Sequence, residues 1–151
     1  MSIKYRVATV SDNKKLDALD LASTDGELAT YSRNKKDLFD VKDYHKRGGS
    51  FWVAEDGNKI IGMVGVRLSD EGMKVKALRV HPEYRKLGIG RKLMNILEEY
   101  CKKHKVIELI LGVNKESLPA IKLYESLGYK RYKEKEFKPG NIVYYYKKTL
   151  N

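Results

Sequence analysis

The sequence predicts an α+β fold in which helices cover both faces of one twisted, mixed and mostly antiparallel β-sheet with a single parallel crossover. Three observations lead to this prediction. Apolar, β-branched segments separated by turn residues in the first half favour an antiparallel meander. A helical pattern between two strands, the second almost continuously apolar, indicates one parallel crossover. Two final strands joined by a turn then close the sheet.

The chain of 151 residues has the length of one domain, and we expect residues 1–151 to form a single domain. Its composition, 42% hydrophobic and 34% charged, is typical of soluble globular proteins. The sequence contains no apolar run near the roughly 18 residues of a membrane span and no signal-peptide pattern. We therefore expect a cytoplasmic protein without a membrane partner. One cysteine and three histidines offer no zinc-binding spacing, so no metal site is predicted.

The formal net charge of +11 lies entirely in the carboxy-terminal half. Residues 1–72 carry 12 basic and 12 acidic side chains, whereas residues 73–151 carry 19 basic and 8 acidic ones. Such an excess fits either a solvated lysine-rich surface or a polyanionic ligand. The same half also contains the glycine-rich segment that suits a phosphate group, which favours the ligand.

The amino-terminal elements are a strand, two helices and a hairpin. Residues 3–8 are expected to form the strand. Ser11 is expected to cap a helix with one face that carries Leu16, Leu19 and Ala22. A second helix is expected over residues 34–46, before a pair of glycines. An Asp-Gly-Asn turn then joins two strands, residues 50–55 and 59–68.

Residues 73–81 predict a strand with a hydrophobic alternation that changes phase. Val75 and Ala77 are apolar on one face, but Leu78 and Val80 take the apolar positions further along. A β-bulge produces such a shift of one residue, and bulges next to active sites free backbone groups from the ladder. A strand buried on both faces would give a similar pattern, so both interpretations stay open.

The parallel crossover consists of a helix over residues 90–104 and a buried strand over residues 106–113. Cys101 lies on the apolar stripe of this helix and is predicted to be a buried small residue rather than a nucleophile. Ser117 is expected to cap a further helix that ends at Gly128. A closing hairpin is expected from two strands, residues 129–137 and 142–150.

The segment RKLGIG, residues 85–90, joins the end of a strand to the start of a helix. Glycines there let backbone N–H groups approach a ligand, and the helix amino terminus adds partial positive charge, so the segment suits a pyrophosphate. Its Walker and Rossmann alternatives are disfavoured, because GxxxxGK[ST] is absent and Leu93 stands where a third glycine is required. A basic helix cap without a ligand remains an alternative. Cations within or beside the segment are Arg85, Lys86, Arg91 and Lys92.

Together with its surroundings, this segment resembles the GCN5-related N-acetyltransferase (GNAT) superfamily. The resemblance covers residues 73–132 and consists of a strand ending in LRVHPEYR, then RxxGxG, then a buried strand, then NKESLPAIKLYESLGYK. Four motifs in the right order are more specific than any one of them. The resemblance implies a GNAT-type fold and an acetyl-CoA-dependent transferase that moves an acetyl group directly to a primary amine. Residues 1–72 fit the family's order of elements but carry no distinctive residue.

The resemblance also implies which residues contact acetyl-CoA. Backbone groups of the bulged strand would bind the pantetheine arm, and amides of the glycine-rich loop would bind the pyrophosphate. Residues around the next helix would contact the pantetheine and line the approach to the thioester. The implied acetyl-CoA-binding set is Leu78, Arg79, Val80, Arg85, Lys86, Leu87, Gly88, Ile89, Gly90, Arg91, Asn114, Ser117, Ala120 and Tyr124.

Tyr124 is the predicted catalytic residue. When a neutral amine attacks the thioester, the N–H of Val80 can stabilise the oxyanion, and the Tyr124 hydroxyl can protonate the departing thiolate. Some family members carry a glutamate at the position of Lys74, and no carboxylate replaces it on this strand. We name no general base. A water path to Glu55, His81 or a backbone carbonyl, or deprotonation in solvent, stays open.

Two further functions are compatible with the sequence. One is a catalytically inactive acetyl-CoA-binding regulatory domain, and the other is an RNA- or polyanion-binding module with tyrosines that stack on bases, such as Tyr129, Tyr132 and residues 144–146. We expect no nucleic-acid partner, because alternating tyrosine and lysine on a sheet edge has a structural explanation. Residues 144–146 are compatible with a homodimer interface or a sheet edge. The acceptor, a small-molecule or peptide amine, is not identified.

Overall fold

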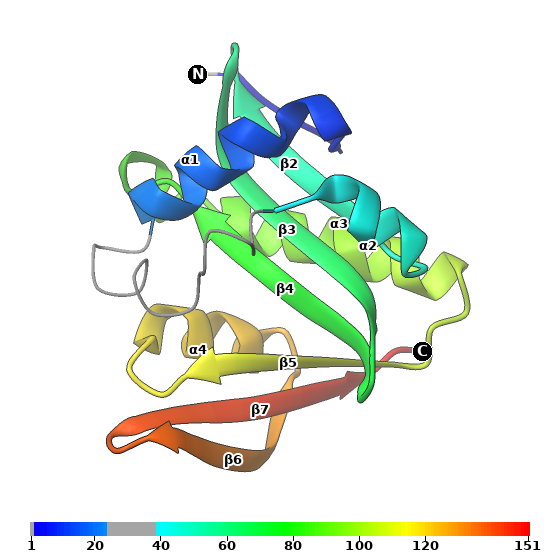
Figure 1. Cartoon of the computed structure of the whole chain (residues 1–151), viewed down its shortest axis with the longest axis vertical. Helices are drawn as coiled ribbons and strands as arrows, with labels where there is room; N and C mark the ends of the chain where they lie inside the picture. The colour runs from blue at the N-terminus through cyan, green and yellow to red at the C-terminus, as the bar shows by residue number, and fades with distance from the viewer. Residues whose placement is uncertain (1, 24–38) are drawn as a thin grey trace.

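The computed structural model describes residues 2–23 and 39–151, which form one seven-stranded sheet with helices on both faces (Figure 1). The strand order is β1-β2-β3-β4-β5-β7-β6, and only β4 and β5 are parallel among the described neighbours. The predicted mixed α+β fold is therefore confirmed. The strands are β1 Ile3–Val7, β2 Ser50–Asp56, β3 Lys59–Ser69, β4 Gly72–Val80, β5 Glu108–Asn114, β6 Lys130–Lys138 and β7 Asn141–Thr149. The helices are α1 Asn13–Ser23, α2 Val41–Lys46, α3 Ile89–Lys103 and α4 Leu118–Ser126, with short 3-10 turns η1 Val10–Asp12 and η2 Pro82–Tyr84.

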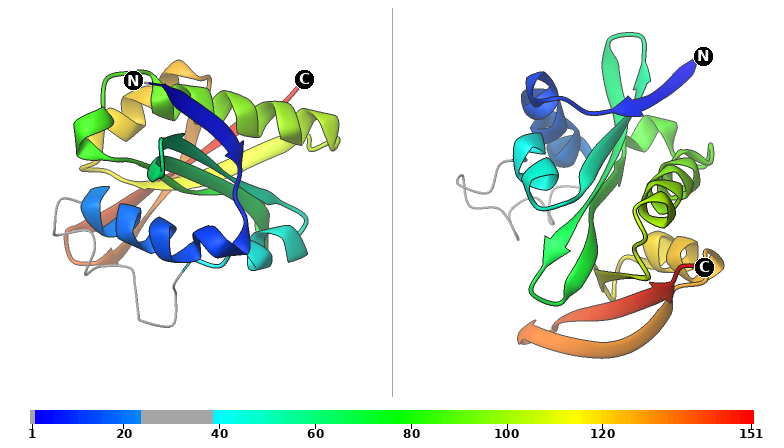
Figure 2. Two further views of the ribbon diagram at one scale, coloured as in Figure 1. Left: turned by 90° about the horizontal axis from the view of Figure 1, so that it is seen from above. Right: turned by 90° about the vertical axis from the view of Figure 1, so that its right-hand side faces the viewer.

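Two hydrophobic clusters lie on opposite faces of the sheet. Figure 2 shows α3 and α4 on one face of the sheet and α1 and α2 on the other. The larger cluster is formed with α3 and α4 and includes Leu93, Leu97 and Tyr146, whereas the smaller lies beneath α1 and α2 around Phe51. At Gly62 of β3, an added Cβ would lie 2.9 Å from Ile89 Cγ2, so the absence of a side chain there lets the start of α3 approach the sheet. No helix within the described ranges is long and apolar enough to cross a bilayer.

The helix α1 begins differently from the prediction. Ser11 is not its N-cap, because the chain first passes through η1 and the Asp12 carboxylate accepts the Thr9 backbone N–H at 2.8 Å. An acidic side chain three residues after a threonine satisfies a free amide at the turn, in the manner of a capping box. Leu16 and Leu19 are buried, but Ala22 is exposed because it lines a surface hollow instead of the core.

The second helix is shorter than predicted. Within the described residues α2 starts at Val41, and Phe39 and Asp40 are not helical. Asp40 is the N-cap, and its carboxylate accepts the Lys42 backbone N–H at 3.1 Å. The predicted start at residue 34 overlooked this capping signal; residues 34–38 themselves lie outside the described residues.

An ion-pair cluster fixes the start of α1 to the sheet and allows a stability prediction. Arg6 donates to both carboxylate oxygens of Asp12 at 2.9 Å and to Glu55 at 3.2 Å. These hydrogen bonds from Arg6 lower the pKa of Asp12 from 3.8 to about 2. Asp12→Asn is therefore expected to lower the free energy of unfolding by about 2 kcal/mol at pH 7, measured by urea denaturation.

The sign of the pH dependence follows from the lowered pKa of Asp12. Because the folded chain holds this carboxylate ionised more strongly than the unfolded chain does, its stabilisation is present above about pH 4 and is lost as the pH falls toward 2. The difference between wild type and Asp12→Asn should shrink over this window. Equal unfolding free energies at pH 7 would show that Asp12 contributes nothing through its charge.

The predicted bulge in β4 is confirmed. Ala77 and Leu78 together face the single residue Val64 of β3, where the register shifts. Ala77 adopts φ +62°, a left-handed conformation that is uncommon for a residue with a side chain. The bulge re-aims the last residues of β4 and changes which of them face the α3 side of the sheet.

The strands β4 and β5 separate beyond their first residues. Their register is recorded only for the pair Lys74 and Ile110, after which the two strands diverge toward their carboxyl ends (Figure 1). We call the wedge between them the splay. The strand β5 starts two residues later than predicted, and Ile107 before it is 73% exposed instead of buried.

The tyrosine-rich segment of the last strand lies inside the sheet. Because β7 pairs with both β5 and β6, the described sheet ends at β6, and Tyr145 and Tyr146 are buried by their own chain. The expectation that residues 144–146 lie at a sheet edge is therefore wrong, and the possible homodimer stays a prediction. Tyr129 is also buried, which leaves Tyr132 as the most exposed ring of those proposed to stack on bases.

Candidate active site

The backbone of β4 beyond the bulge points into the splay. The His81 N–H donates to the Ile61 carbonyl at 2.8 Å, so this position faces β3. Backbone groups alternate sides along a strand, so those of Leu78 and Val80 point away from β3. The β4–β5 register does not extend to them. The carboxyl end of β4 therefore presents strand backbone that has no neighbouring strand.

Two arginines hold this backbone against the end of α1. Arg79 donates to the Leu78 carbonyl at 2.9 Å and to Asp20 Oδ1 at 3.0 Å. Arg85 donates to the Val80 carbonyl at 3.4 Å and to the Ser23 carbonyl at 2.7 Å. Asp20 is 2% exposed, so its charge is compensated inside the protein by Arg79. Both carbonyls at the splay are thus satisfied, whereas the amides of Leu78 and Val80 are directed into it.

The glycine-rich loop presents a row of unpaired amides. Gly88 adopts φ +80° as the N-cap of α3, a conformation that favours glycine. The first helical hydrogen bond runs from the Lys92 N–H to the Gly88 carbonyl at 3.0 Å. Before it, the N–H groups of residues 86–91 donate to no acceptor among the described residues. These donors and the positive end of the helix dipole form a site for an anion.

The loop lies directly against β4 and α4. A Cβ on Gly90 would stand 3.8 Å from Val80 Cγ2 and 3.4 Å from Leu123 Cδ2, both ordinary contact distances. Gly90 therefore has room for a small side chain, and no left-handed backbone conformation requires glycine there. The backbone conformation thus explains the glycine at position 88 but not the glycine at position 90. The free amides and the splay are neighbours in space.

The predicted cations around the loop differ in what they can reach. The Arg85 guanidinium is turned toward α1, and Arg91 Nη2 donates to Ser126 Oγ of α4 at 2.7 Å. Lys86 and Lys92 are exposed, and Leu87 is 52% exposed beside them. The two lysines remain the side chains that can meet an anion at the loop without breaking a described hydrogen bond.

Tyr124 lies on α4 inside the larger hydrophobic cluster. It is 7% exposed, and its ring packs edge-on against Tyr129 at a centroid distance of 5.9 Å. Burial raises the pKa of Tyr124 to about 12, against an opposing effect of the Arg79 guanidinium. Its hydroxyl has no hydrogen-bond partner among the described residues. A buried, unpaired hydroxyl is uncommon and leaves a donor for a ligand.

The remaining predicted residues line the start of α4. The Asn114 carbonyl oxygen Oδ1 accepts the Glu116 N–H at 2.8 Å, and its Nδ2 donates to Asn141 Oδ1 at 3.2 Å. Ser117 is the N-cap by position, but its side chain makes no capping hydrogen bond, so the predicted cap is a backbone feature only. Ala120 packs against the larger cluster.

The structure brings most of the predicted site residues together, but it does not identify a general base. Leu78, Val80, Ile89, Ala120 and Tyr124 share the larger cluster, with the free amides of the loop beside them. Sequence reasoning missed the carboxylate and carbonyl that hold the arginines. Asp20 and Ser23 are 59 and 62 residues away from Arg79 and Arg85, and no local pattern reveals such pairs.

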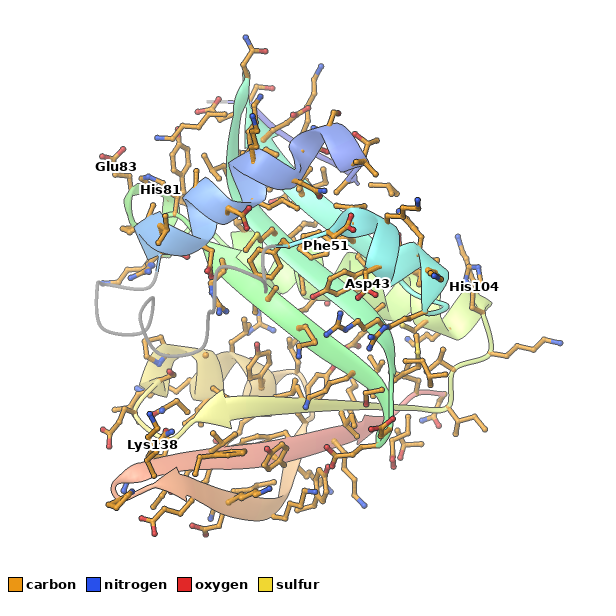
Figure 3. The ribbon with its side chains drawn as sticks, in the orientation of Figure 1. Asp43, Phe51, His81, Glu83, His104 and Lys138 are labelled. Carbon is orange, nitrogen blue, oxygen red and sulfur yellow. The ribbon has the colours of Figure 1, made fainter. Side chains whose placement is uncertain are left out.

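The groups considered for a proton path to solvent have other partners. Glu55 binds Arg6, and His81 Nδ1 accepts the Glu83 N–H at 3.1 Å. His81, labelled in Figure 3, also lines a hollow of about 380 Å³ that is formed with α1 and the turn after β2. Cys101 is fully buried, and burial raises the pKa of its thiol to about 12, which confirms that it is a packing residue.

Comparison with known proteins agrees with this geometry. Residues 17–129 match the family model described as acetyltransferase (GNAT) family. Because the match covers more than half of the chain, the protein belongs to the GNAT acetyltransferase family, as the four linked motifs predicted. Members of this family are acyl-transferring enzymes that use acetyl-CoA.

Curated relatives resemble part of this chain. It is 34% identical over 103 residues to human N-acetyltransferase 8, a match that covers 63% of this chain and 45% of the relative. It is 40% identical over 85 residues to the N-terminal acetyltransferase B complex catalytic subunit NAA20 of Arabidopsis thaliana, covering 52% of this chain and 49% of that protein. The chain thus spans less than half of the length of these relatives.

Solved structures share the fold over nearly the whole chain. An acetyltransferase of the GNAT family from Staphylococcus aureus has a TM-score of 0.83 at 22% identity and covers 99% of this chain and 100% of its own. The protein yncA of Salmonella typhimurium, solved with its cofactor acetyl-CoA, has a TM-score of 0.75 at 18% identity, over 100% of this chain and 95% of its own. At these identities the likeness concerns the fold.

Proposed function

We propose that the protein is an acetyl-CoA-dependent N-acetyltransferase that moves the acetyl group directly to a primary amine. The observation that carries this proposal is the row of unpaired amides at residues 86–91 beside the part of β4 that has no neighbouring strand on its β5 side. The loop amides match the oxygens of a pyrophosphate, and a strand edge with free amides matches an extended chain that contains amide carbonyls. CoA contains both a pyrophosphate and an extended pantetheine arm with amide carbonyls.

Two groups of this chain have separate roles in the proposed reaction. When bound, acetyl-CoA supplies the acetyl group as a thioester. The Val80 N–H points into the splay, where it can donate to negative charge that develops on the thioester oxygen. The Tyr124 hydroxyl stays protonated at neutral pH because its pKa is about 12, so it holds a proton for the departing sulfur. No side chain is assigned as the base, and deprotonation of the amine through water or in solvent fits the arrangement.

The printed names of the relatives support an amine nitrogen as the acceptor. Human N-acetyltransferase 8 and the catalytic subunit NAA20 are both named for N-acetylation. A small-molecule amine and a peptide amine are both compatible with the site. An acetyl-CoA-binding domain without catalysis is the second candidate, because the loop amides would serve it equally well.

Acetyl-CoA is expected to raise the unfolding temperature, and CoA is expected to do the same. A ligand present at a hundredfold excess over its Kd stabilises the folded state by about 2.7 kcal/mol. Pantetheine, which lacks the pyrophosphate, should stabilise the chain much less, because it cannot reach the amides of residues 86–91. Differential scanning fluorimetry measures all three. No shift with millimolar acetyl-CoA would contradict the proposal.

A thiol-release assay then separates the two candidates. Acetyl-CoA is offered with amino acids, polyamines, aminoglycosides, or peptides that have free amino termini or lysines. Release of CoA that depends on one amine class identifies an enzyme. Binding of acetyl-CoA without release for any amine favours the regulatory domain instead.

A further inference from the structure

One region of the sheet is left without a helix. On the side that carries α1 and α2, these helices pack over β2, β3 and β4. No helix of the described residues packs on the same side of β5, β7 and β6 (Figure 2). The opposite side of these strands carries α4, to which Tyr146 is joined by a hydrogen bond from its hydroxyl to Glu125 at 2.9 Å.

The uncovered side carries lysines that lie over aromatic rings. We call Lys74, Lys133, Lys135 and Lys147, with their rings, the lysine face. The Nζ-to-centroid distances are 5.6 Å for Lys74 over Tyr145, 4.9 Å for Lys133 over Tyr145, 5.0 Å for Lys147 over Tyr132 and 4.9 Å for Lys135 over Phe137. Each ammonium gains from the ring beneath it, which fixes its position relative to the sheet. The lysine face is thus an ordered row of positive charges drawn from three strands.

Gly112 of β5 leaves room for the side chains on which the lysine face rests. A Cβ on Gly112 of β5 would lie 3.2 Å from Tyr145 Cε1 and 3.3 Å from Val143 Cγ1. Both side chains therefore extend across β5 on the uncovered side, where a larger residue would displace them. The Tyr145 ring is 9% exposed, so it serves as a platform for lysines rather than as a free stacking surface.

Glu71 compensates part of the positive charge of the lysine face, and it acts on Lys74 and Lys135 at longer range than on Lys133. Lys133 pairs with Glu71 at 2.8 Å, and this contact lowers the pKa of Glu71. Lys74, Lys135 and Lys147 form no ion pair with any described carboxylate. Three ammonium groups are therefore available to an anionic partner, in a half of the chain that carries the whole excess charge.

The lysine face borders the splay. Asn114 at the end of β5 pairs with Val143, which pairs with Lys135 of β6, so Lys135 lies about 10 Å from the end of β5. Lys74 stands where the splay closes, in register with Ile110. The tip of the β6–β7 hairpin, marked by Lys138, lies on the side to which the splay opens (Figure 3). An acceptor in the splay on the side opposite α3 therefore lies near this surface.

We propose that the lysine face binds an acidic segment of a polypeptide acceptor that presents its amino group in the splay. This inference rests on the proposed acetyltransferase function. Ammonium groups act as point charges that suit carboxylates, and the Tyr145 ring, over which two of the lysines lie, is too buried for the base stacking that single-stranded nucleic acid uses. An extended peptide advances about 3.3 Å per residue, so carboxylates a few residues from the amino terminus reach Lys135 from the splay.

The test compares matched peptides and two charge-reversed variants. The peptides share a free amino terminus and a carboxy-terminal fluorophore, and they carry glutamates, glutamines or lysines at the positions after the first. Lys135→Glu combined with Lys147→Glu alters the lysine face. Lys4→Glu combined with Lys103→Glu is the control, because both lysines are exposed, make no described contact and lie on β1 and at the end of α3. The two double variants change the net charge equally.

The wild type and the control should prefer the glutamate peptide over the glutamine peptide by about tenfold in kcat/KM, and added salt should reduce this preference. The altered lysine face should lose the preference but keep its activity on the glutamine peptide. Equal kcat/KM for the glutamate and glutamine peptides with the wild type would overturn the proposal.

Fluorescence anisotropy without acetyl-CoA separates this proposal from the enzymatic one. If no peptide is acetylated but the glutamate peptide binds the wild type and the control and not the altered lysine face, the lysine face is confirmed and the proposed function fails. If a single-stranded RNA of similar charge binds more tightly than the glutamate peptide and loses affinity in the altered face, the partner is a nucleic acid and the peptide proposal is overturned.

Discussion

Tyr124→Phe is expected to lower kcat by about 10²–10⁴-fold, the contribution of a positioned acid, while the Kd of acetyl-CoA changes little. The substitution removes only the hydroxyl of a buried ring, so packing in the larger cluster is kept. A loss in kcat without a loss in binding marks an interaction made mainly in the transition state. Steady-state kinetics with the true acceptor and calorimetry with acetyl-CoA measure the two quantities.

Tyr129→Phe is the matched control for this experiment. Tyr129 is also buried and contacts the Tyr124 ring, but its hydroxyl donates to Glu98 Oε2 at 2.9 Å. Removing it should lower the free energy of unfolding by leaving Glu98 with one partner fewer, without a selective effect on kcat. If Tyr124→Phe turns over at the wild-type rate, the sulfur receives its proton elsewhere.

The pH profile should have a single ascending limb. Amine acceptors must lose a proton, so activity rises with pH toward the pKa of the acceptor. The Tyr124 hydroxyl acts in its protonated form, and burial raises its pKa from 10 to about 12, so it remains an acid throughout this range. A descending limb centred below pH 10 in kcat would indicate another acid.

Gly88→Val is expected to weaken acetyl-CoA binding by about a hundredfold or more while the chain still folds. The Cβ at position 88 meets no atom of the protein, so the new side chain occupies the space before the unpaired amides of residues 86–91. The φ of +80° adds backbone strain that reorients the loop, since β-branched residues rarely adopt it. Calorimetry gives the Kd, and circular dichroism reports the fold.

Gly57→Val supplies the control for strain alone. Gly57 has φ +62° and open space around its Cβ, but it lies in the turn between β2 and β3. Its substitution should cost similar stability and leave the Kd of acetyl-CoA unchanged. Wild-type affinity in Gly88→Val would show that the loop does not hold the cofactor.

Local patterns in the sequence predicted most of the fold and the parts of the site made by backbone. The change of phase near Ala77 became a bulge, and the glycines before α3 became a loop with free amides, because both features depend on a few adjacent residues. Helix starts were less accurate. Asp12 and Asp40 satisfy amides at positions that hydrophobic periodicity alone does not mark.

Features that depend on contacts distant in sequence could not be predicted. The closing hairpin places β7 rather than β6 beside β5, and this choice buries the tyrosines that a terminal strand would expose. The partners of Arg79 and Arg85 lie on α1, so the sequence showed two cations without showing that one is already paired with buried Asp20. The lysine face likewise exists only because the sheet brings β4 near the closing hairpin of β6 and β7, which lies far from β4 in the chain.

Because β4 separates from β5, the carboxyl-terminal part of β4 is an unpaired strand edge between two strands of the same sheet. Outer edges are open to pairing with other proteins and are commonly protected by charge, as the lysines of β6 protect that edge here. The interior edge differs from an outer edge in its place, because β4 lies between β3 and β5 and not at the boundary of the sheet. The carbonyls of Leu78 and Val80 already accept hydrogen bonds from Arg79 and Arg85, so we expect an extended ligand at this edge to be selected for the hydrogen-bond acceptors that it brings to the amides.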